Sequence, residues 1–575
     1  MSETAFSTYL AQYTLEKYET EFADRHLLHG AIAKWAHEHP DEIAIHEFDT
    51  GRDYTYGELE DLTTVYALEL IELGFRPGDF LATLLPLLAE HIILEYACFK
   101  IGVIHAPLDL RLKTPEVVRS LSLIEPKGFA FLGKTSAGDF GETVGRDCPY
   151  VEHFLQFAPP GETIDGALAF SDFVAQAAAL AEQAALDRDN SPIWDAYQDA
   201  AQSVKPTDGA QVIYTTGSTG FPKPALLSHR NITCQNMCLA AGFEMTGDLR
   251  MLVNLPPSHV GCQGEQLMTA FFTGGRAVVL HVFDPEKTLK AIEEQKVGCF
   301  GQIPAMFNIQ WQLPNFDDYD RSSVERVMYG GQQVTAQFVG QLMDRFPKLG
   351  TGLGLTEMAG FVTYSDPDAG IDDLVESVGW AMPVTPLTIR QPMKPDGSAG
   401  EVLPDGEAGE ICFSGPQVFI AYVNNDEAYR KTVSTDGICY TGDLGYKSER
   451  GLIFSGRSKL VIKPKGYQVH PAQIEQHFAQ LKDQVAACGA VGAAHDVFSE
   501  AIVLFVEPKP DATLTRDELE AHAKGIAAYM RPSHYVLLTP GKFPLNRVAK
   551  TDYVTLSQLA QSEVEDLRSA GGWDR

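Results

Sequence analysis

The chain reads YTTGSTGFPK at positions 214–223, that is Tyr214, Thr215, Thr216, Gly217, Ser218, Thr219, Gly220, Phe221, Pro222 and Lys223. An apolar run precedes this segment and a helix-like stretch begins near residue 231, which indicates a loop between two elements. Glycines permit unusual backbone angles, hydroxyl groups donate hydrogen bonds, and Lys223 adds a fixed positive charge, so the loop is suited to wrap a polyphosphate. It is not a Walker A loop, because Pro222 separates the glycines from the lysine. The alternative is an ordinary turn rich in Gly, Ser and Thr.

Four further segments carry candidate chemistry. Thr356 and Glu357, in the segment 354–357, place a hydroxyl beside a carboxylate, a pairing that suits Mg²⁺ when the ion also holds phosphate oxygens. Asp443 follows a Gly turn and is suited to accept hydrogen bonds from ribose hydroxyls, although such an Asp often only stabilises its turn. The segment 456–459 (GRSK) opens a basic stretch, and the segment 544–550 (PLNRVAK) ends in Lys550, which could reach a developing negative charge.

The hydrophobic pattern predicts an α/β fold. Residues 31–37 and 56–73 have helical periodicity, whereas 43–46 and 80–85 are short apolar runs, so crossover connections and a parallel sheet are expected. Residues 158–206 indicate a helical surface excursion, and residues 401–446 a β-rich subdomain. After residue 456 the pattern predicts a smaller α+β unit with a helix from about Pro471. We therefore expect an N-terminal domain at 1–456 and a C-terminal domain at 457–575.

Composition restricts the partners. The 575 residues include 45 Lys and Arg against 77 Asp and Glu, a formal net charge of −32, so nucleic acid and anionic lipid are disfavoured unless basic residues gather locally. Such a local exception exists at 447–465, where six basic residues face one acidic residue. Nine scattered cysteines without a CxxC pair favour a reducing compartment and argue against a disulfide scaffold or zinc site. The N-terminus predicts no signal peptide, and the most apolar run (80–99) is interrupted by polar residues, so a cytoplasmic protein without a membrane span is expected.

In their order and spacing these five segments resemble the adenylate-forming superfamily, which includes acyl-CoA synthetases, aryl-CoA ligases, firefly luciferase and the adenylation domains of peptide synthetases. The segments 54–59 (YTYGEL) and 99–109 (FKIGVIHAPLD) also look like early motifs of that family, so the resemblance covers essentially the whole chain. It implies a large N-terminal domain, a small mobile C-terminal lid, and an active site between the two.

The resemblance also implies a role for each matching position. Thr215 to Lys223 would bind the ATP phosphates, Glu357 with Thr356 would hold Mg²⁺, Asp443 and Arg457 would hold the ribose, and Lys550 would bridge the reacting carboxylate and the α-phosphate. The remaining assignments are the adenine side (Gly330, Gly331, Gln332), the hinge (Lys459), a lid lysine (Lys463), the CoA channel (Gly466, Tyr467) and the acyl pocket (His259, Gly261, Cys262, Ala359, Gly360).

Three positions depart from the family pattern. Pro224 follows the loop lysine where glycine is usual, which fixes φ and removes a backbone donor. Leu353 stands where an aromatic residue usually contacts adenine, and Ala549 stands where glycine usually precedes the lid lysine. None of these changes removes a charge that adenylation needs.

The leading hypothesis is an ATP-dependent carboxylic acid:CoA ligase that releases pyrophosphate and AMP. The substrate-side segment 256–264 contains no Asp to hold an α-ammonium group, which disfavours an amino acid, and residues 302–306 (QIPAM) add a largely apolar wall. We therefore expect an uncharged apolar acid: aromatic, alicyclic or medium-chain. Three alternatives stay open: an enzyme that delivers the acyl group to a carrier protein, a luciferase-like oxygenase, and a catalytically silent nucleotide-binding homologue. A homodimer is also left open.

Overall fold

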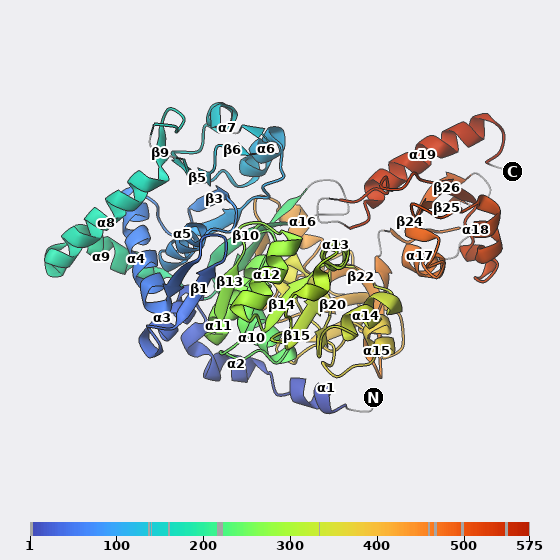
Figure 1. Ribbon diagram of the computed structural model, residues 1–575, viewed down its shortest axis with the longest axis horizontal. Helices are drawn as coiled ribbons and strands as arrows, with labels where there is room; N and C mark the ends of the chain where they lie inside the picture. The colour runs from blue at the N-terminus through green and yellow to red at the C-terminus, as the bar shows by residue number, and fades with distance from the viewer. Residues whose placement is uncertain are drawn as a thin grey trace.

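The computed structural model describes residues 4–135, 138–139, 141–158, 161–215, 222–332, 334–457, 460–464, 469–495, 499–546 and 550–573. Two large sheets with helices against them form the main body, and a small unit at the C-terminus lies beside it (Figure 1). The helices described before residue 457 are α1 Ala5–Leu10, α2 Leu15–Glu21, α3 Leu28–Glu38, α4 Tyr56–Glu72, α5 Ala89–Lys100, α6 Thr114–Ile124, α7 Gly141–Asp147, α8 Phe170–Leu186, α9 Pro192–Ser203, α10 His229–Gly242, α11 Thr269–Thr273, α12 Pro285–Gln295, α13 Pro304–Trp311, α14 Ala336–Met343, α15 Ile371–Glu376 and α16 Asp426–Arg430.

The first sheet has seven strands in the order β16-β15-β14-β12-β13-β1-β2. All of its pairings are parallel except that of β1 with β2 at the edge. Helices α12, α13 and α14 connect its successive parallel strands. The strands are β16 Leu349–Gly350, β15 Arg326–Tyr329, β14 Cys299–Gln302, β12 Arg250–Val253, β13 Arg276–Val279, β1 Ile43–Glu47 and β2 Arg52–Thr55.

The second sheet has eight strands in the order β21-β11-β10-β4-β3-β5-β8-β9. It is parallel from β10 to β9 and antiparallel where β10, β11 and β21 pair. The strands are β21 Ala421–Tyr422, β11 Lys223–Ser228, β10 Gly209–Thr215, β4 Ile104–Pro107, β3 Phe80–Leu84, β5 Gly128–Phe131, β8 His153–Gln156 and β9 Ala167–Ala169. The predicted parallel α/β fold is confirmed, with antiparallel strands added at one edge of each sheet.

A four-stranded antiparallel sheet forms the β-rich part that follows. Its order is β19-β20-β22-β23, with bounds β19 Leu387–Arg390, β20 Gly409–Phe413, β22 Cys439–Ser448 and β23 Gly451–Arg457. Short two-stranded pairs are β6 Lys134–Thr135 with β7 Gly138–Asp139, and β17 Gly354–Leu355 with β18 Gly360–Phe361. The last of these pairs frames the 3₁₀ turn η5, Thr356–Met358, which carries the predicted hydroxyl and carboxylate.

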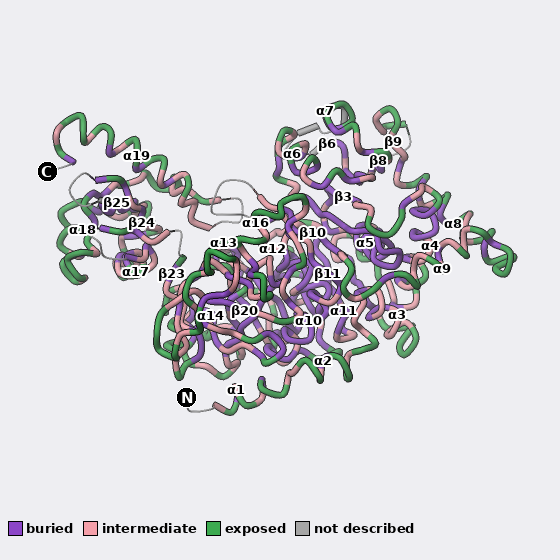
Figure 2. Tube along the Cα trace, turned by 180° about the vertical axis from the view of Figure 1, so that it is seen from behind, coloured by how far each residue is buried: buried purple, intermediate pink, exposed green. Residues whose placement is uncertain are grey.

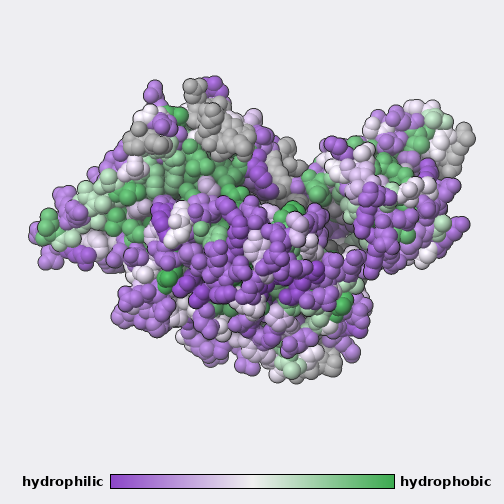
Figure 3. Space-filling view, in the orientation of Figure 1, coloured by the Kyte–Doolittle hydropathy of each residue, from purple (hydrophilic) through white to green (hydrophobic). Residues whose placement is uncertain are grey.

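The C-terminal unit is an α+β domain with its own core. It contains β24 Val485–His495, β25 Ser499–Pro508, β26 His534–Leu537, α17 Pro471–Phe478, α18 Arg516–Ala523 and α19 Tyr553–Ser569. Two clusters of buried apolar residues on the two sides of this sheet include only residues from Ile462 onward. Figure 2 shows the same separation, since buried residues form one large region in the main body and a second, smaller one in this unit. Figure 3 shows that the surface is notched where the unit meets the main body.

Local sequence signals explain where several elements begin. Thr55 and Glu58, in a segment that resembles an early family motif, form a capping box at the start of α4. Ser228 and Asn231 form another at the start of α10, so the turn after β11 satisfies its own backbone donors. The apolar run 80–99 divides into β3 and α5, and every residue of α5 except Glu90 is buried. No helix in the described part of the chain is long and apolar enough to cross a membrane.

Candidate active site

A cavity of about 600 Å³ opens where the parallel strands of both large sheets end. Residues just beyond β12, β14 and β15 line one side of it, and residues at the ends of β4 and β10 line the other. The carboxyl ends of parallel strands share one edge of a sheet, and ligands of open α/β sheets bind outside that edge. Lys550 from the C-terminal unit completes the lining, so the cavity lies between the two domains.

One end of the cavity is built for phosphate. Thr215, the last residue of β10, is almost completely buried, and its hydroxyl oxygen has no hydrogen-bond partner among the described residues. Lys223, the first residue of the antiparallel strand β11, pairs with Thr215 in register, so strand pairing places the two side by side. A buried hydroxyl without a partner is costly unless a ligand binds it. The hydroxyl and the lysine are therefore positioned for an anion at this end.

Glu357 is held by a tyrosine that the sequence analysis did not single out. The hydroxyl of Tyr422 donates to Glu357 Oε1 at 2.5 Å, and Lys223 Nζ lies 4.2 Å from the centre of the Tyr422 ring. Strand β21 pairs with β11, which brings Tyr422 between the lysine and the carboxylate. The carboxylate raises the pKa of the Tyr422 hydroxyl further than burial alone does, so the phenol keeps its proton and remains a donor.

Asp443 and Arg457 face each other on paired strands. Arg457, the last residue of β23, is in register with Asp443 on β22, and its Nε lies 3.2 Å from Asp443 Oδ1. Asp443 is only 5% exposed, and no residue in the described part of the chain donates an aligned hydrogen bond to its Oδ1. Burial raises the pKa of the Asp443 carboxyl to about 6, against the opposing charges of Arg457 and Lys550. Such a carboxylate is ready to accept hydrogen bonds from sugar hydroxyls.

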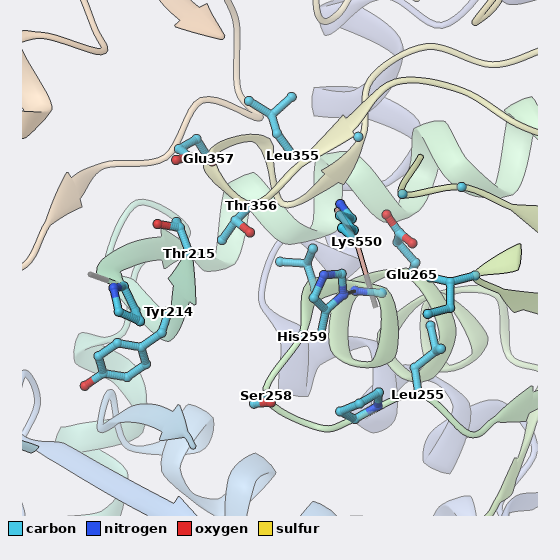
Figure 4. A pocket seen from close by; sticks show the side chains of 18 of the residues that line it. Tyr214, Thr215, Leu255, Ser258, His259, Glu265, Leu355, Thr356, Glu357 and Lys550 are labelled. Carbon is cyan, nitrogen blue, oxygen red and sulfur yellow. Dashed lines mark hydrogen bonds between the residues drawn. The ribbon is translucent and has the colours of Figure 1, made fainter. Parts of the chain in front are cut away.

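Lys550 enters the cavity from the C-terminal unit. Burial, and then the charge of Arg457, lowers the pKa of the Lys550 ammonium to about 8, while Asp443 and Glu265 act in the opposite direction. In Figure 4 the Lys550 side chain lies beside Glu265 and His259, with Thr215, Thr356 and Glu357 toward the other side. Both Glu265 and His259 have pKa values that respond to the charge of Lys550. The lysine therefore lies between Glu265 on one side and the end of the cavity that contains Thr215, Thr356 and Glu357 on the other.

Two local features hold Lys550 in this position. The backbone N–H of Lys550 donates to Asn546 Oδ1 at 3.0 Å, and the N–H of Asn546 donates to the carbonyl oxygen of Lys550 at 2.7 Å. On the opposite wall Gly331 has φ +88°, and a Cβ there would lie 3.3 Å from Lys550 Cε. A side chain at position 331 would be strained and would crowd the lysine. Asn546 therefore positions Lys550, and Gly331 leaves room for it.

His259 is neutral in this environment. Its ring Nδ1 accepts a hydrogen bond from the backbone N–H of Gly261 at 3.0 Å, which leaves the proton on Nε2. Burial, with the positive charges of Lys550 and Arg111, lowers the pKa of the His259 ring to about 4. His259 and Gly261 both line the cavity, as the sequence predicts for pocket-wall residues. The histidine is thus a hydrogen-bond donor at neutral pH and not a charge.

The cavity does not include every predicted residue. The prediction of Cys262 as a pocket residue is wrong, because its side chain is fully buried in the main core, where nearby Glu95 adds to the effect of burial in raising the pKa of the thiol. Ala359 is also a core residue, and Gly360 lies behind the wall, where a Cβ would come within 2.8 Å of Glu265 Oε1. Gln332 and Lys463 are exposed and lie outside the lining.

Several predicted positions lie outside the described residues. They comprise the loop centre (Thr216, Gly217, Ser218, Thr219, Gly220), the hinge position (Lys459) and the CoA-channel pair (Gly466, Tyr467). Among the described ones, the structure brings Thr215, Lys223, Gly330, Gly331, Thr356, Glu357, Asp443, Arg457, Lys550, His259 and Gly261 to one cavity.

Glu265 is an acidic residue of the cavity that the sequence analysis did not identify. Glu265 is one position beyond the segment searched for an acidic group, and it lines the cavity from the π-helix η3, Gly261–Met268. A π-helix adds a residue per turn and often occurs at functional sites. Glu265 directly follows Gly264 in the sequence, so the local signal for this residue is an acidic side chain at the end of the substrate-side segment.

The residues at the phosphate end fit a divalent cation that also contacts phosphate. Tyr422 occupies Glu357 Oε1, which leaves Oε2 available, and Thr356 and Thr215 supply neighbouring hydroxyl groups. In the described part of the chain, no group of three or more His, Cys, Asp or Glu side chains could hold a metal ion. Mg²⁺ usually takes one or two carboxylates and completes its shell with phosphate and water. A single carboxylate beside a polyphosphate site fits that requirement.

This fold, with a lysine from a small C-terminal domain reaching a phosphate site, defines an adenylate-forming enzyme. The chain belongs to the AMP-binding enzyme family: residues 32–423 match the family model for the AMP-binding enzyme, and residues 473–550 match that for its C-terminal domain. The predicted family and fold are therefore confirmed.

Curated relatives and solved structures agree with this assignment. The chain is 28% identical to a feruloyl-CoA synthase from Amycolatopsis sp. over 84% of this chain and 89% of the relative. It is 25% identical to the medium-chain fatty-acid–CoA ligase of Escherichia coli over 92% of this chain and 90% of the relative. The fold is similar to ATP-bound MatB from Rhodopseudomonas palustris, with a TM-score of 0.74, 21% identity, and coverage of 93% of this chain and 99% of that chain. It is also similar to the anthranilate CoA ligase AuaEII in complex with anthranoyl-AMP, with a TM-score of 0.77, 18% identity, and coverage of 93% and 98%.

Proposed function

We propose that this chain is an ATP-dependent carboxylic acid:CoA ligase that forms an acyl-adenylate and then an acyl-CoA. The single observation that carries the proposal is the convergence of Lys550, Asp443, Glu357 and Thr215, from four separate elements, on one cavity. The family assignment and the relatives, which are named for ligation of ferulate, indoleacetate and medium-chain fatty acids to CoA, support the same reaction.

In the first half-reaction a carboxylate oxygen of the acid attacks the α-phosphorus of ATP, and the bond to pyrophosphate breaks. Two anions approach each other in this step, so the protein must offset negative charge in the transition state. Lys550 lies where the carboxylate and the α-phosphate meet, Thr215 and Lys223 face the phosphates, and Asp443 holds the ribose. Glu357 and Thr356 would hold Mg²⁺, which when bound supplies positive charge to the phosphate oxygens.

In the second half-reaction the thiol of CoA attacks the carbonyl carbon of the mixed anhydride. The bond to AMP breaks, AMP leaves as the anion, and the thiol gives up its proton. We propose that the C-terminal domain, residues 457–575, turns about Lys459 between the two steps, and that Lys463, Gly466 and Tyr467 then face a pantetheine channel. The exposed position of Lys463, while Lys550 is in the cavity, supports two alternative orientations of one domain.

We further propose that CoA is the acyl acceptor and that the protein works in a reducing compartment. CoA is favoured over a carrier protein because the relatives are named as CoA ligases, and the basic stretch 447–465 suits the phosphates of CoA. All nine cysteines are free, and eight are buried, which supports a reducing compartment such as the cytoplasm. The proposed homodimer stays a prediction.

The test is a panel of aromatic, alicyclic and medium-chain acids incubated with ATP, Mg²⁺ and the enzyme, with AMP and thioester as readouts. Acid-dependent AMP formation that requires CoA is the expected result. Thioester formation only on a phosphopantetheinyl carrier protein would favour carrier delivery. Absence of acid-dependent ATP–pyrophosphate exchange across the panel would favour a silent homologue.

A further inference from the structure

Glu265 is an acidic side chain in the part of the cavity that faces the acyl group. It lies on η3, near His259 and Lys550, and the surrounding wall is otherwise mainly apolar, with Leu255, Ile303 and Met306. The adenylation steps above use Lys550, Asp443 and Glu357, and none of them requires a carboxylate at position 265. A carboxylate in an apolar wall is unfavourable unless something pairs with it.

The two oxygens of Glu265 lie between two glycines. A Cβ on Gly360 would come within 2.8 Å of Oε1, and a Cβ on Gly261 would come within 3.5 Å of Oε2. Gly261 lines the cavity and contributes no side chain there, and the His259 ring and Leu255 also lie close to the Gly261 position. No described side chain donates a hydrogen bond to Glu265, and burial raises the pKa of its carboxyl to about 7 despite the nearby Phe361 N–H and the charge of Lys550.

Gln302 adds a second polar group to the same wall. It is the last residue of β14, only 3% of it is exposed, and it lines the cavity. Within the described ranges, neither its Oε1 nor its Nε2 has a hydrogen-bond partner. A buried amide with both groups unsatisfied is unfavourable, and a ligand that pairs with it removes that penalty. Gln302 is thus an unsatisfied polar group among the described residues, and Glu265 is a carboxyl with the Phe361 N–H as its backbone donor; both line the same cavity.

We propose that Glu265 selects an acid whose apolar body carries a hydrogen-bond donor, such as a hydroxyl, amino or ring N–H group, with Gln302 as a second polar contact. This inference rests on the proposed acid:CoA ligase function and narrows its substrate class. A wholly hydrocarbon acid would leave Gln302 unpaired and Glu265 without a ligand contact, whereas an acid that carries a donor can pair with these side chains. A site built to pair with a substrate donor discriminates strongly against the analogue that lacks it.

The test compares acids that differ only in the donor. Unsubstituted, hydroxy, amino and methoxy forms of benzoate, phenylpropanoate and cinnamate, with the substituent at each ring position, are assayed by ATP–pyrophosphate exchange. The methoxy group keeps an oxygen but donates no hydrogen bond and is larger than a hydroxyl or amino group, whereas the unsubstituted acid is smaller, so the two analogues bracket the donor group in size and separate donation from shape. We expect at least one donor-bearing acid to exceed both its unsubstituted and methoxy analogues in kcat/KM by about tenfold or more, as for hydrogen bonds to charged groups.

The variant Glu265→Gln tests the residue itself, because it keeps the shape and removes the carboxylate. We expect the ratio of kcat/KM for the donor-bearing acid over its methoxy analogue to fall by about tenfold or more. Gln302→Met should reduce the same ratio by a smaller factor. Glu294→Gln, at an exposed position of α12, is the matched control and should leave the ratio unchanged. A thermal unfolding midpoint for each variant checks that it folds.

Two results would overturn the inference while leaving the proposed function intact. One is a wild-type enzyme that activates unsubstituted or methoxy acids as well as every donor-bearing acid, a comparison that does not depend on any variant folding. The other is an equal loss for all acids in Glu265→Gln, which would mean that Glu265 acts only through the charge of Lys550. Absence of exchange with every acid would overturn the proposed function and this inference together.

Discussion

The hydroxyl of Tyr422 donates a 2.5 Å hydrogen bond to Glu357 Oε1, across 65 residues of sequence. This bond fixes the carboxylate beside the phosphate end of the cavity and leaves its second oxygen for Mg²⁺. It exists because β21 pairs with β11, the strand that begins at Lys223. The antiparallel edge of the eight-stranded sheet therefore positions a residue proposed to hold the metal.

Replacing Tyr422 with phenylalanine should weaken the use of Mg²⁺ and ATP. Loss of a hydrogen bond to a charged group costs about 1.5–3 kcal/mol, so we expect KM for Mg·ATP to rise about tenfold and half-saturation by Mg²⁺ to require a higher concentration. The measurement is ATP–pyrophosphate exchange at varied Mg²⁺. Tyr429→Phe, on α16, is the control because no hydrogen bond from its hydroxyl reaches Glu357. Identical Mg²⁺ curves for wild type and Tyr422→Phe would show that the bond does not position the carboxylate.

Asn546→Ala should slow adenylation without removing Lys550. The Asn546 side chain accepts a hydrogen bond from the Lys550 backbone N–H, and its loss leaves only the backbone bond from the Asn546 N–H to the Lys550 carbonyl oxygen to hold the lysine in the productive position. We expect kcat for adenylate formation to fall by about tenfold, with a smaller change in the affinity for ATP. Single-turnover adenylation and equilibrium ATP binding are the two readouts. An effect on ATP binding alone would contradict a positioning role for Asn546.

The rate of adenylation should fall as the pH rises through about 8. Burial and Arg457 lower the pKa of Lys550 to about 8, and the lysine acts only as a cation, so the free enzyme loses the active form above that pH. We expect kcat/KM for the acid to decrease on this alkaline limb. Lys550→Arg keeps a cation at all accessible pH values, so any residual activity should lack the limb. A limb that persists unchanged in Lys550→Arg would assign it to another group.

Asp443→Asn should weaken nucleotide binding without destabilising the free enzyme. The Asp443 carboxyl is buried, and burial raises its pKa to about 6, so its charge is unfavourable in the free protein. We expect KM for ATP to rise about tenfold, because a hydrogen-bond acceptor for the ribose is weakened. The thermal unfolding midpoint of the variant should equal or exceed that of the wild type. A lower midpoint with unchanged KM would mean that Asp443 serves the fold and not the nucleotide.

Much of the site could be predicted from sequence because its residues occur in short motifs at the ends of elements. Thr215 ends β10, Glu357 lies in the turn η5 after β17, Asp443 lies within β22, and Lys550 lies before α19. The packing of the sheets and of the C-terminal domain brings these four residues to one cavity. The alternation of helix and strand patterns likewise predicts the α/β fold, because parallel strands require crossover helices.

What sequence reasoning missed depends on contacts between distant segments. Tyr422 reaches Glu357 only through a strand pairing that no local pattern reveals. Cys262 is turned into the core by a π-helix, a conformation without a reliable local pattern, and the same helix presents Glu265 to the cavity. Asn546 reads as a turn residue in sequence, and its role is visible only when its side chain is seen to bond the backbone of Lys550.

In the proposed mechanism, Lys550 supplies the positive charge for adenylate formation by this ligase. The most direct measurement is the single-turnover rate of acyl-adenylate formation by Lys550→Ala, with an acid that the wild type activates and with ATP binding measured separately. We expect the rate of acyl-adenylate formation to fall by about 100-fold or more while ATP binding is largely retained, because the charge acts mainly in the transition state. Lys542→Ala, at an exposed position of the same domain, should keep the wild-type rate. An unchanged rate in Lys550→Ala would show that Lys550 does not supply the positive charge for adenylate formation.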